Sequence, residues 1–294
     1  MYGESQAELI ESILVKLGIE VYYLNDVHTS GSFIQKSINF YKTVKNMDYV
    51  YRVFGKPRLD KRFLISKLLK KTTITHWIGT DVLYAQKNRF KIYNIINNMI
   101  TDINISGSNL LRSELLELGI DSIEIPILPS KDMSTDSNMP DEHSVLVYAP
   151  EGKEEFYGMK YIEVLAKRYP NILFNVVGNS NDYLGIRNLV FRGILNFDEM
   201  EKLYNNITIL FRFPEHDGLS LMLLEALAKG KIVIYPYDFP YVNTPISREI
   251  IDVVDCFDNI IKNKPILNTD GSEYIRNTYT EDQLIKKYKR IFGF

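Results

Sequence analysis

The stretch FPEHDGLSLMLLEALAKG, residues 213–230, predicts a loop that carries an acid and then a buried helix. Strong helix formers fill residues 221–229, Ser220 stands at the N-cap position, and Gly230 stands where a left-handed residue ends a helix. The helix is apolar nearly all round, so we expect it in the interior, yet it carries Glu225. An unpaired carboxylate there is costly, which favours hydroxyl or amide partners and a binding site over plain core.

The residues before this helix suit an anion. Asp217 lies eight positions before Glu225, and Gly218, Leu219 and Ser220 lead directly into the helix. A helix that opens with a glycine exposes free backbone N–H groups at its electropositive end, and phosphate groups bind at such ends. The stretch therefore predicts a site for a ligand that contains phosphate.

The spacing Asp217-x7-Glu225, with GLSLMLLEALAKGKIVI around it, resembles the Glu-x7-Glu element of retaining glycosyltransferases of the GT-B architecture, in particular glycosyltransferase family 4. The resemblance implies that Asp217 contacts the transferred sugar, that the amides of Gly218, Leu219 and Ser220 hold the diphosphate, and that Glu225 binds the ribose hydroxyls. The first acid is Asp rather than Glu and is one methylene shorter, which affects the donor contact.

Length and composition restrict the class of protein. A chain of 294 residues predicts two domains of roughly 150 residues each. The formal net charge of -2 gives no support for general nucleic-acid binding. Cys256 is the only cysteine, which excludes an intrachain disulfide and favours a reducing compartment. No apolar run approaches the roughly 18 residues of a membrane span, and the N-terminus does not resemble a signal peptide, so we expect a cytoplasmic protein.

The first half alternates strands and helices. An amphipathic helix is predicted at 4–17, and the predicted strands are 19–24, 49–54, 72–77, 101–106 and 123–127. Short apolar strands that alternate with helices form a parallel sheet covered on both faces. GT-B enzymes open with a strand and a glycine-rich turn, whereas this sequence opens at Tyr2-Gly3, already in the turn, where Gly3 is expected at the substrate. The strand that would lie mid-sheet is missing, so we expect a rearranged sheet or a substitute strand.

A second alternation follows the polar stretch 131–142, which is predicted as the domain boundary. Its predicted strands are 145–148, 172–177, 189–191, 208–213 and 231–235. The resemblance thus implies an α/β GT-B fold, with two Rossmann-like domains that face each other across a cleft. The expected parts are an acceptor-binding domain at 1–140, a nucleotide-sugar-binding domain at 141–278, and a final helix at 279–294 that packs back on the first domain.

Cations are needed because negative charge grows on a leaving diphosphate. No Asp-x-Asp pair occurs, so no metal is expected. Relatives supply an Arg and a Lys from the loop after the first strand of the second domain, but here Glu151 and Tyr157 stand in those places. Lys153 in the same loop or Arg212 can replace them. The alternatives are that Lys153 is solvated and that Arg212 pairs with Glu215.

Two histidines are further candidates. His76, in His-Trp-Ile-Gly-Thr-Asp at a strand end, resembles the His-Gly-x-Asp stretch of relatives, with two residues inserted before the Gly, and is predicted near the sugar. Trp77 beside it is the residue that could instead belong to the core. His216, beside Asp217, is expected either to contact the donor sugar or to support the site. The histidines have no metal-site spacing.

A basic stretch at residues 56–71, from Lys56 to Lys71, carries seven cations and one acid. Two interpretations stay open: contact with the inner face of an anionic membrane that presents a lipid-linked acceptor, or a solvated outer helix. Its apolar residues are scattered on a helical wheel, which does not fit an interfacial helix.

We therefore expect a retaining, metal-independent glycosyltransferase that transfers a sugar from a nucleotide-diphosphate sugar to a glycan, lipid or protein acceptor, without a cofactor. The alternative is a catalytically inactive relative that binds a nucleotide or sugar, and a GT-B epimerase is a weaker third. Dehydrogenase, P-loop, hydrolase and zinc-protease motifs are absent from the sequence.

Overall fold

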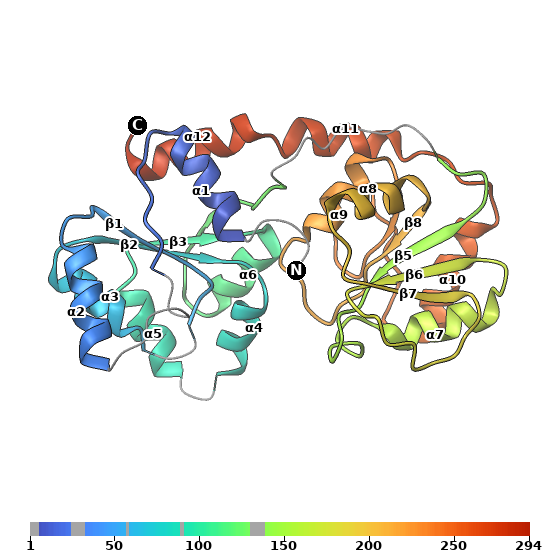
Figure 1. The fold of residues 1–294 in the computed structure, drawn as a ribbon, viewed down its shortest axis with the longest axis horizontal. Coiled ribbons are helices and arrows are strands. Elements are labelled where there is room, and N and C mark those ends of the chain that lie inside the picture. Colours follow the sequence, from blue (N-terminus) through green and yellow to red (C-terminus); the bar gives the residue numbers. More distant parts are fainter. Residues whose placement is uncertain (1–5, 25–32, 57–58, 89–90, 130–138) are drawn as a thin grey trace. The chain divides into compact units, whose positions relative to one another are not determined.

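The computed structural model describes residues 6–24, 33–56, 59–88, 91–129 and 139–294 (Figure 1). These residues form two compact units. The first, which we call the N-terminal unit, contains residues 6–127, 216–219 and 281–294. The second, the C-terminal unit, contains residues 128–215 and 220–280. The polar stretch predicted as the boundary falls largely on residues 130–138, which lie outside the described residues.

The N-terminal unit contains a parallel sheet of four strands in the order β1-β2-β3-β4. The strands are β1 (Tyr49–Val53), β2 (Thr72–Trp77), β3 (Ile103–Ser106) and β4 (Ile123–Glu124). These four agree with the predicted positions. The predicted strand at 19–24 is wrong, because those residues run as an extended segment in Figure 1 but pair with no described strand. The sheet is therefore continuous from β1 to β4 without that strand.

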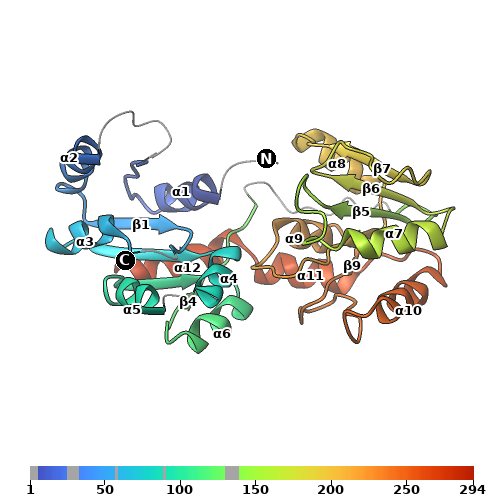
Figure 2. The ribbon, with the colours of Figure 1, turned by 90° about the horizontal axis from the view of Figure 1, so that it is seen from below.

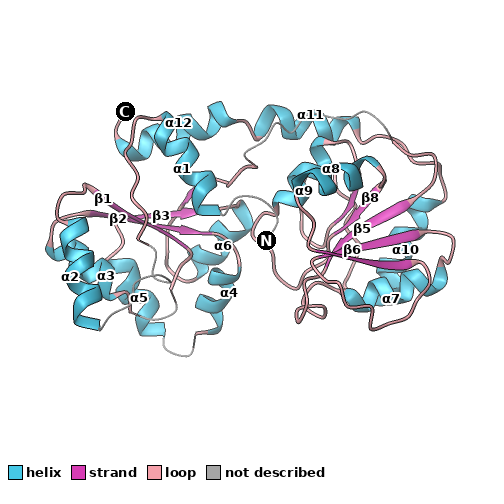
Figure 3. Cartoon of the chain, viewed as in Figure 1, coloured by secondary structure: helices cyan, strands magenta, loops and turns pink. Residues whose placement is uncertain are grey.

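Helices cover both faces of this sheet (Figures 1, 2 and 3). In Figure 1, α2, α3 and α5 lie on one face of the sheet, and α1 and α12 lie on the other. The helices of the unit are α1 (Gln6–Lys16), α2 (Phe33–Val44), α3 (Lys61–Leu68), α4 (Thr80–Lys87), α5 (Lys91–Met99), α6 (Asn109–Glu117) and α12 (Glu281–Phe292).

The last helix of the chain, α12, is built into the N-terminal unit. Its buried residues are Leu284, Tyr288 and Phe292. The Phe292 ring meets the Tyr49 ring edge-on with centroids 4.8 Å apart. Lys16 of α1 forms an ion pair with Glu281 at 2.5 Å. The far end of the sequence thus completes the layer above the first strands.

A chain of polar groups lies inside this layer. The Tyr51 hydroxyl is 2.8 Å from His76 Nδ1 and 3.2 Å from the Tyr288 hydroxyl. His76 Nε2 is 2.9 Å from the backbone oxygen of Ile125. Because Nε2 must donate to that carbonyl, Nδ1 accepts from Tyr51. The sheet and α12 are therefore joined by satisfied buried hydrogen bonds as well as by apolar packing.

The C-terminal unit contains a parallel sheet of five strands in the order β7-β6-β5-β8-β9. Its strands are β5 (Ser144–Tyr148), β6 (Leu173–Val177), β7 (Leu189–Gly193), β8 (Ile209–Phe211) and β9 (Ile232–Ile234). All five lie where the sequence predicted them. The central strand β5 is completely buried at Val145, Leu146 and Val147, as a strand covered on both faces must be.

Two layers of helices cover this second sheet. Buried side chains of α7 and α10 pack with β5 and β6 in one core cluster. On the other side α9 packs against β9 and α11 (Figure 1). The helices are α7 (Met159–Arg168), α8 (Phe197–Asn205), α9 (Leu221–Ala228), α10 (Ile250–Ile261) and α11 (Thr269–Thr278).

The ends of α9 follow the sequence closely. Ser220 occupies the N-cap position without a side-chain cap, and its backbone oxygen accepts from Leu223 and Leu224 at 3.1 and 3.2 Å. Gly230 has φ of +67°, so the predicted left-handed residue is confirmed. Its N–H donates to Leu227 at 2.8 Å and that of Lys231 donates to Ala226 at 2.9 Å, which is a Schellman ending.

We expect Tyr51→Phe to destabilise the protein by about 1–2 kcal/mol, because it leaves buried His76 without the donor for Nδ1. Urea denaturation of the full chain measures this change. The control is Tyr84→Phe, since Tyr84 is 52% exposed. Equal stability of Tyr51→Phe and wild type would show that the hydrogen-bond chain contributes nothing.

Candidate functional site

Loops at the carboxyl edge of the second sheet position the first candidate groups. β5 and β8 are neighbours, with Val147 opposite Phe211, so the loops that follow them leave the sheet side by side. The two loops are joined where the Glu215 N–H donates to the Phe156 oxygen at 2.8 Å. Gly158 lets them approach, because a Cβ there would lie 2.7 Å from the Phe213 oxygen. Ligands of open parallel sheets bind at this edge.

Arg212 is the cation held at this edge. Its residue is only 8% exposed, and its guanidinium lies 5.7 Å from the Tyr148 ring centre and 5.6 Å from that of Tyr157. The aromatic rings fix its position through cation–π contact. Lys153, by contrast, is exposed in the loop after β5. Of the two cations that the sequence suggested, Arg212 is the one that the fold orients.

Glu225 lies on α9 with a hydroxyl partner, as the sequence predicted. The Tyr204 hydroxyl donates to Glu225 Oε2 at 2.8 Å. Lys229, one turn later, forms its ion pair with Glu201 at 2.6 Å. Burial raises the pKa of Glu225 to about 7, and the charge of Glu201 adds to this, while the Tyr204 hydrogen bond and Lys229 act in the opposite direction. Glu225 is therefore a carboxyl group that changes charge near neutral pH.

The short segment 216–219 belongs to the N-terminal unit, where it lies against the loop after β2. A Cβ on Gly218 would lie 2.2 Å from the Ile78 backbone oxygen, so only glycine fits there. Gly79 faces it and has φ of +151°, a conformation that favours glycine. Asp217 is 8% exposed, and its Oδ1 accepts from the Gly218 N–H at 3.1 Å. Asp217, the first acid of the pair, therefore directly precedes a glycine whose backbone packs closely against the backbone of Ile78 and Gly79.

His216, in the same segment, is held by Glu114, an acid that no sequence pattern singled out. Its Nε2 lies 2.9 Å from Glu114 Oε2 and 3.2 Å from Oε1, and the residue is 6% exposed. Its Nδ1 is buried without a partner among the described residues. His216 therefore has one ring nitrogen fixed by Glu114 and one that remains available for a hydrogen bond.

Asp81 fixes the loop that Gly218 touches. This residue is 1% exposed, and its carboxylate accepts backbone N–H groups of Gly55 at 2.7 Å, Gly79 at 2.8 Å, Val82 at 3.0 Å and Ile78 at 3.1 Å. The sequence pattern that could have identified Asp81 is Gly-Thr-Asp at the end of a predicted strand. Asp81 is a positioning residue for the 78–79 backbone.

His76 has a different setting from the one predicted near the sugar. It is fully buried, and both ring nitrogens are hydrogen-bonded inside the N-terminal unit, to Tyr51 and Ile125. Burial lowers its pKa to about 4, so it is neutral at pH 7. These contacts place His76 in the interior of the N-terminal unit, beside Trp77, which is 3% exposed and belongs to the core as the sequence allowed.

The remaining candidates can be placed briefly. Leu219 is partly exposed in segment 216–219, and Ser220 is buried at the start of α9. Gly3 lies outside the described residues. Among the described residues, no three His, Cys, Asp or Glu side chains are arranged to hold a metal ion. The residues around the candidates that sequence reasoning missed are Glu114, Asp81, Tyr148, Tyr204, Glu201 and Lys229.

Comparison with known proteins identifies the fold. No protein-family model matches the sequence, and no curated protein matches it. Anabaena HepE, solved with UDP and glucose, superimposes with a TM-score of 0.71 at 12% identity, covering 96% of this chain and 88% of HepE. Sucrose-phosphate synthase of Thermosynechococcus elongatus gives 0.66 at 12% identity, covering 89% and 76%. Staphylococcus aureus TarM gives 0.62 at 13% identity, covering 83% and 55%.

These neighbours are glycosyltransferases of the GT-B architecture. Two parallel sheets of four and five strands, each covered by helices, match its two Rossmann-like domains. The predicted GT-B fold is therefore confirmed.

We expect the stability of the protein to fall as pH rises from about 5 to 8 because of Glu225. Its pKa is raised from 4.5 to about 7 in the folded state, so the folded chain binds more protons than the unfolded chain in this window. Full ionisation of Glu225 lowers the free energy of unfolding by up to about 3 kcal/mol. Glu225→Gln lacks this loss, so its stability relative to wild type should increase between pH 5 and pH 8.

Urea denaturation at pH 5, 6, 7 and 8 measures the difference. Glu151→Gln, at an exposed loop position, is the control for removing a carboxylate. Parallel pH profiles for wild type and Glu225→Gln would contradict the raised pKa.

Proposed function

We propose that this chain is a retaining, metal-independent glycosyltransferase whose donor is a nucleotide-diphosphate sugar. The observation that carries the proposal is Glu225, an acid on an apolar helix whose partner is the Tyr204 hydroxyl rather than a cation of its own. A partly buried carboxyl group in this state has capacity for further hydrogen-bond donors. Ribose provides two neighbouring hydroxyl donors. The GT-B fold is consistent with such a ligand.

Each further role rests on one local feature. The backbone N–H groups of Gly218, Leu219 and Ser220, which lead into α9, are proposed to hold the diphosphate, because the first N–H groups of a helix have no intrahelical partner. Asp217 is proposed to orient the sugar. His216 Nδ1, which has no partner in the part of the chain that the structure describes, is proposed to form a hydrogen bond with a sugar hydroxyl. These assignments make Glu225 a binding residue and Asp217 the group nearest to the chemistry.

Arg212 is proposed to stabilise the leaving diphosphate. Its buried, ring-supported guanidinium is a fixed positive charge, and a charge that needs no reorganisation stabilises a developing anion most effectively. Lys153 can add a mobile charge from the exposed loop. The resemblance to family 4 implies front-face transfer, in which the donor phosphate takes the proton of the acceptor.

An inactive nucleotide-binding relative is the second candidate. It is favoured by the loop after β5, where exposed Glu151 and partly buried Tyr157 replace the Arg and Lys of relatives. HepE and TarM have been solved with UDP, so UDP and UDP-glucose are the first probes. Release of glucose from UDP-glucose by the full chain would support the transferase, whereas UDP binding without any turnover would support the inactive relative.

We expect Glu225→Gln to weaken UDP binding by at least tenfold at pH 8, because a charged acceptor for the ribose hydroxyls contributes about 1.5–3 kcal/mol. Wild-type affinity should rise from pH 6 to pH 8 more steeply than that of Glu225→Gln, as the carboxyl group ionises around its pKa of about 7. Isothermal titration calorimetry measures both effects. Glu273→Gln, at an exposed position of α11, should bind UDP as the wild type does, and equal affinity of Glu225→Gln would remove Glu225 from the site.

We also propose that α3 and α5 form a surface for an anionic membrane. α5 is inverted: Asn94 and Asn97 are 6% and 3% exposed, whereas Ile92, Ile95 and Met99 are 54%, 55% and 76% exposed. The buried amides are bonded, since Asn94 donates to the Ala85 oxygen at 2.9 Å and Asn97 accepts from the Asp60 N–H at 3.0 Å. An apolar stripe turned outward in this way is typical of an interaction surface.

Basic residues are exposed on α3, which lies on the same face of the sheet as α5 (Figure 1). This helix exposes Leu68 at 83%, together with Lys61 and Lys67, and Lys67 forms an ion pair with Asp102 at 2.5 Å. None of the described helices has the length and apolar run that crossing a bilayer requires. Lysines attracted to anionic lipid, together with a shallow apolar stripe, fit a peripheral contact instead.

We expect the full chain to sediment with vesicles that contain phosphatidylserine and to remain in solution with pure phosphatidylcholine vesicles. Ile92→Asp/Ile95→Asp should reduce the bound fraction at least fivefold, because it places two charges on the inserted stripe. Ile251→Asp, at a 64% exposed position of α10, is the control. Unchanged binding of the double variant would favour a solvated outer surface.

A further inference from the structure

A cavity of about 410 Å³ follows the edge of the first sheet, inside the N-terminal unit. All five residues of β1 line it. Helices α1 and α2 contribute further walls, and so does the extended segment 19–24. The residues of that segment that are most exposed are Tyr22, Tyr23 and Leu24, at 54%, 52% and 40%. The cavity therefore separates an edge strand from an extended segment that has no place in the sheet.

The edge of β1 presents backbone hydrogen-bonding groups to this cavity. The Thr72 N–H donates to the Asp48 oxygen at 3.1 Å, and the Phe54 N–H donates to the His76 oxygen at 2.9 Å. Asp48 and Phe54 thus direct their backbone groups toward β2. Because this direction alternates along a strand, the intervening odd residues, Tyr49, Tyr51 and Val53, direct their N–H and C=O groups away from β2. In the described part of the chain, β2 is the only strand paired with β1.

The cavity lies between the two helical layers of the unit. Val50 packs with Phe40 and Phe63, in the layer of α2 and α3. Tyr49 and Tyr51 contact α12 on the opposite face. Figure 1 places α1 and α12 on one side of the sheet and α2 and α3 on the other, and Figure 2 shows α1 and α2 reaching past β1. A space at the level of the sheet, with apolar walls above and below, has the form of a strand position.

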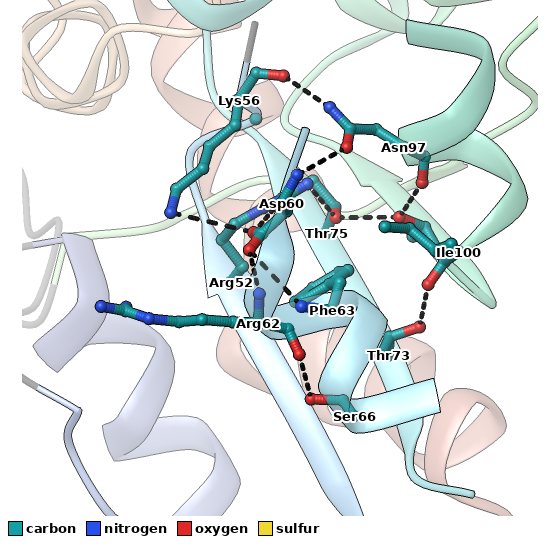
Figure 4. Close-up of polar contacts among 12 residues, drawn as sticks. Arg52, Lys56, Asp60, Arg62, Phe63, Ser66, Thr73, Thr75, Asn97 and Ile100 are labelled. Carbon is teal, nitrogen blue, oxygen red and sulfur yellow. Dashed lines mark hydrogen bonds and ion pairs between the residues drawn. The ribbon is translucent and has the colours of Figure 1, made fainter. Parts of the chain in front are cut away.

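Arg52 adds a donor to the lining of the cavity (Figure 4). Its side chain is 10% exposed and pairs through Nη1 with Asp60, and Nη2 donates to Thr75 Oγ1 at 2.8 Å. Its Nε is buried without an acceptor among the described residues. Lys56 also lines this part of the cavity, 3.8 Å from Asp60. Residues 52–62 therefore contribute three basic side chains and one acidic side chain to the lining, whereas Glu11 and Glu20 line the cavity from α1 and from segment 19–24.

We propose that this cavity binds an extended peptide segment of a partner protein as an additional parallel strand beside β1. The occupant is a run of about five residues with apolar side chains on both faces, followed by an acidic residue that meets Arg52 and Lys56. All strands of this sheet are parallel, so a parallel addition continues the ladder. The N–H and C=O groups at the edge of β1 can pair with the backbone of a peptide. A lipid chain in the same cavity would leave these groups without hydrogen bonds, which costs free energy. This inference does not depend on glycosyl transfer.

The probe is a labelled peptide, KKSVLVYE, with blocked ends. Its SVLVY core is the sequence of β5, which lies in this same chain as a central parallel strand buried on both faces. Fluorescence anisotropy with the full chain should give saturable binding with a Kd below about 100 μM, the range of modest strand addition. No binding up to 1 mM would overturn the proposal.

Backbone pairing is tested with two N-methylated versions of the peptide. One version is methylated at the odd-numbered residues of the SVLVY core and the other at the even-numbered residues. At least one version should bind tenfold more weakly, because a methyl group removes the N–H that pairs with β1. If both methylated peptides bind as tightly as the parent peptide, backbone pairing is absent and the proposal is overturned. The same conclusion follows if sodium laurate displaces the parent peptide and binds as tightly as that peptide does, because the site is then an apolar site for lipid.

A protein variant provides the matched test. Val53→Pro removes an N–H that faces the cavity while an edge strand accepts proline, and it should weaken the peptide at least fivefold. Val53→Ala keeps that N–H and should retain more of the affinity than Val53→Pro. Equal affinities of the two variants would count against pairing at this edge, and the methylated peptides decide the matter if Val53→Pro fails to fold.

Discussion

Parallel strands cannot be joined by tight turns, and this constraint organises both halves of the molecule. Each connection must pass over the sheet, and most of the connections contain a helix, although β6 and β7 are joined by the non-helical residues 178–188. The loops at the carboxyl ends of the strands gather at one edge of the sheet. In the C-terminal unit this brings the loop after β5 beside the end of β8, where Arg212 lies between Tyr148 and Tyr157. The candidate site is a direct consequence of the strand order.

The acid on α9 shows how a costly group is retained in an apolar layer. Glu225 obtains one hydrogen bond from Tyr204, and the neighbouring cation, Lys229, is engaged by Glu201. Full neutralisation by a cation would have made the carboxylate a structural ion pair. Partial satisfaction instead leaves it poised near neutral pH with capacity for further donors, and that combination is common at functional sites.

Much of this arrangement could be predicted from the residues, but the partners of the candidate groups could not. Alternating apolar strands and helices predicted both sheets, and Gly230 predicted the end of α9. The predicted strand at 19–24 failed because a strand requires a neighbour, and a cavity lies between this segment and the free edge of β1. His76 was predicted to contact a ligand at a strand end, yet both of its ring nitrogens are hydrogen-bonded, one to Tyr51 and one to Ile125. Partners 25 and 49 residues away leave no local trace in the sequence.

The sequence by itself determined the two α/β halves, the burial of α9 and the presence of an acid on it, because periodicity and residue preference act over a few neighbouring residues. Only the tertiary structure decided which cation is fixed, that Glu114 holds His216, that Asp81 fixes the loop touching Gly218, and that a cavity follows β1. These outcomes depend on which segments meet in space. That is set by packing and by the pairing of distant backbone groups, for which a single sequence contains no separate signal.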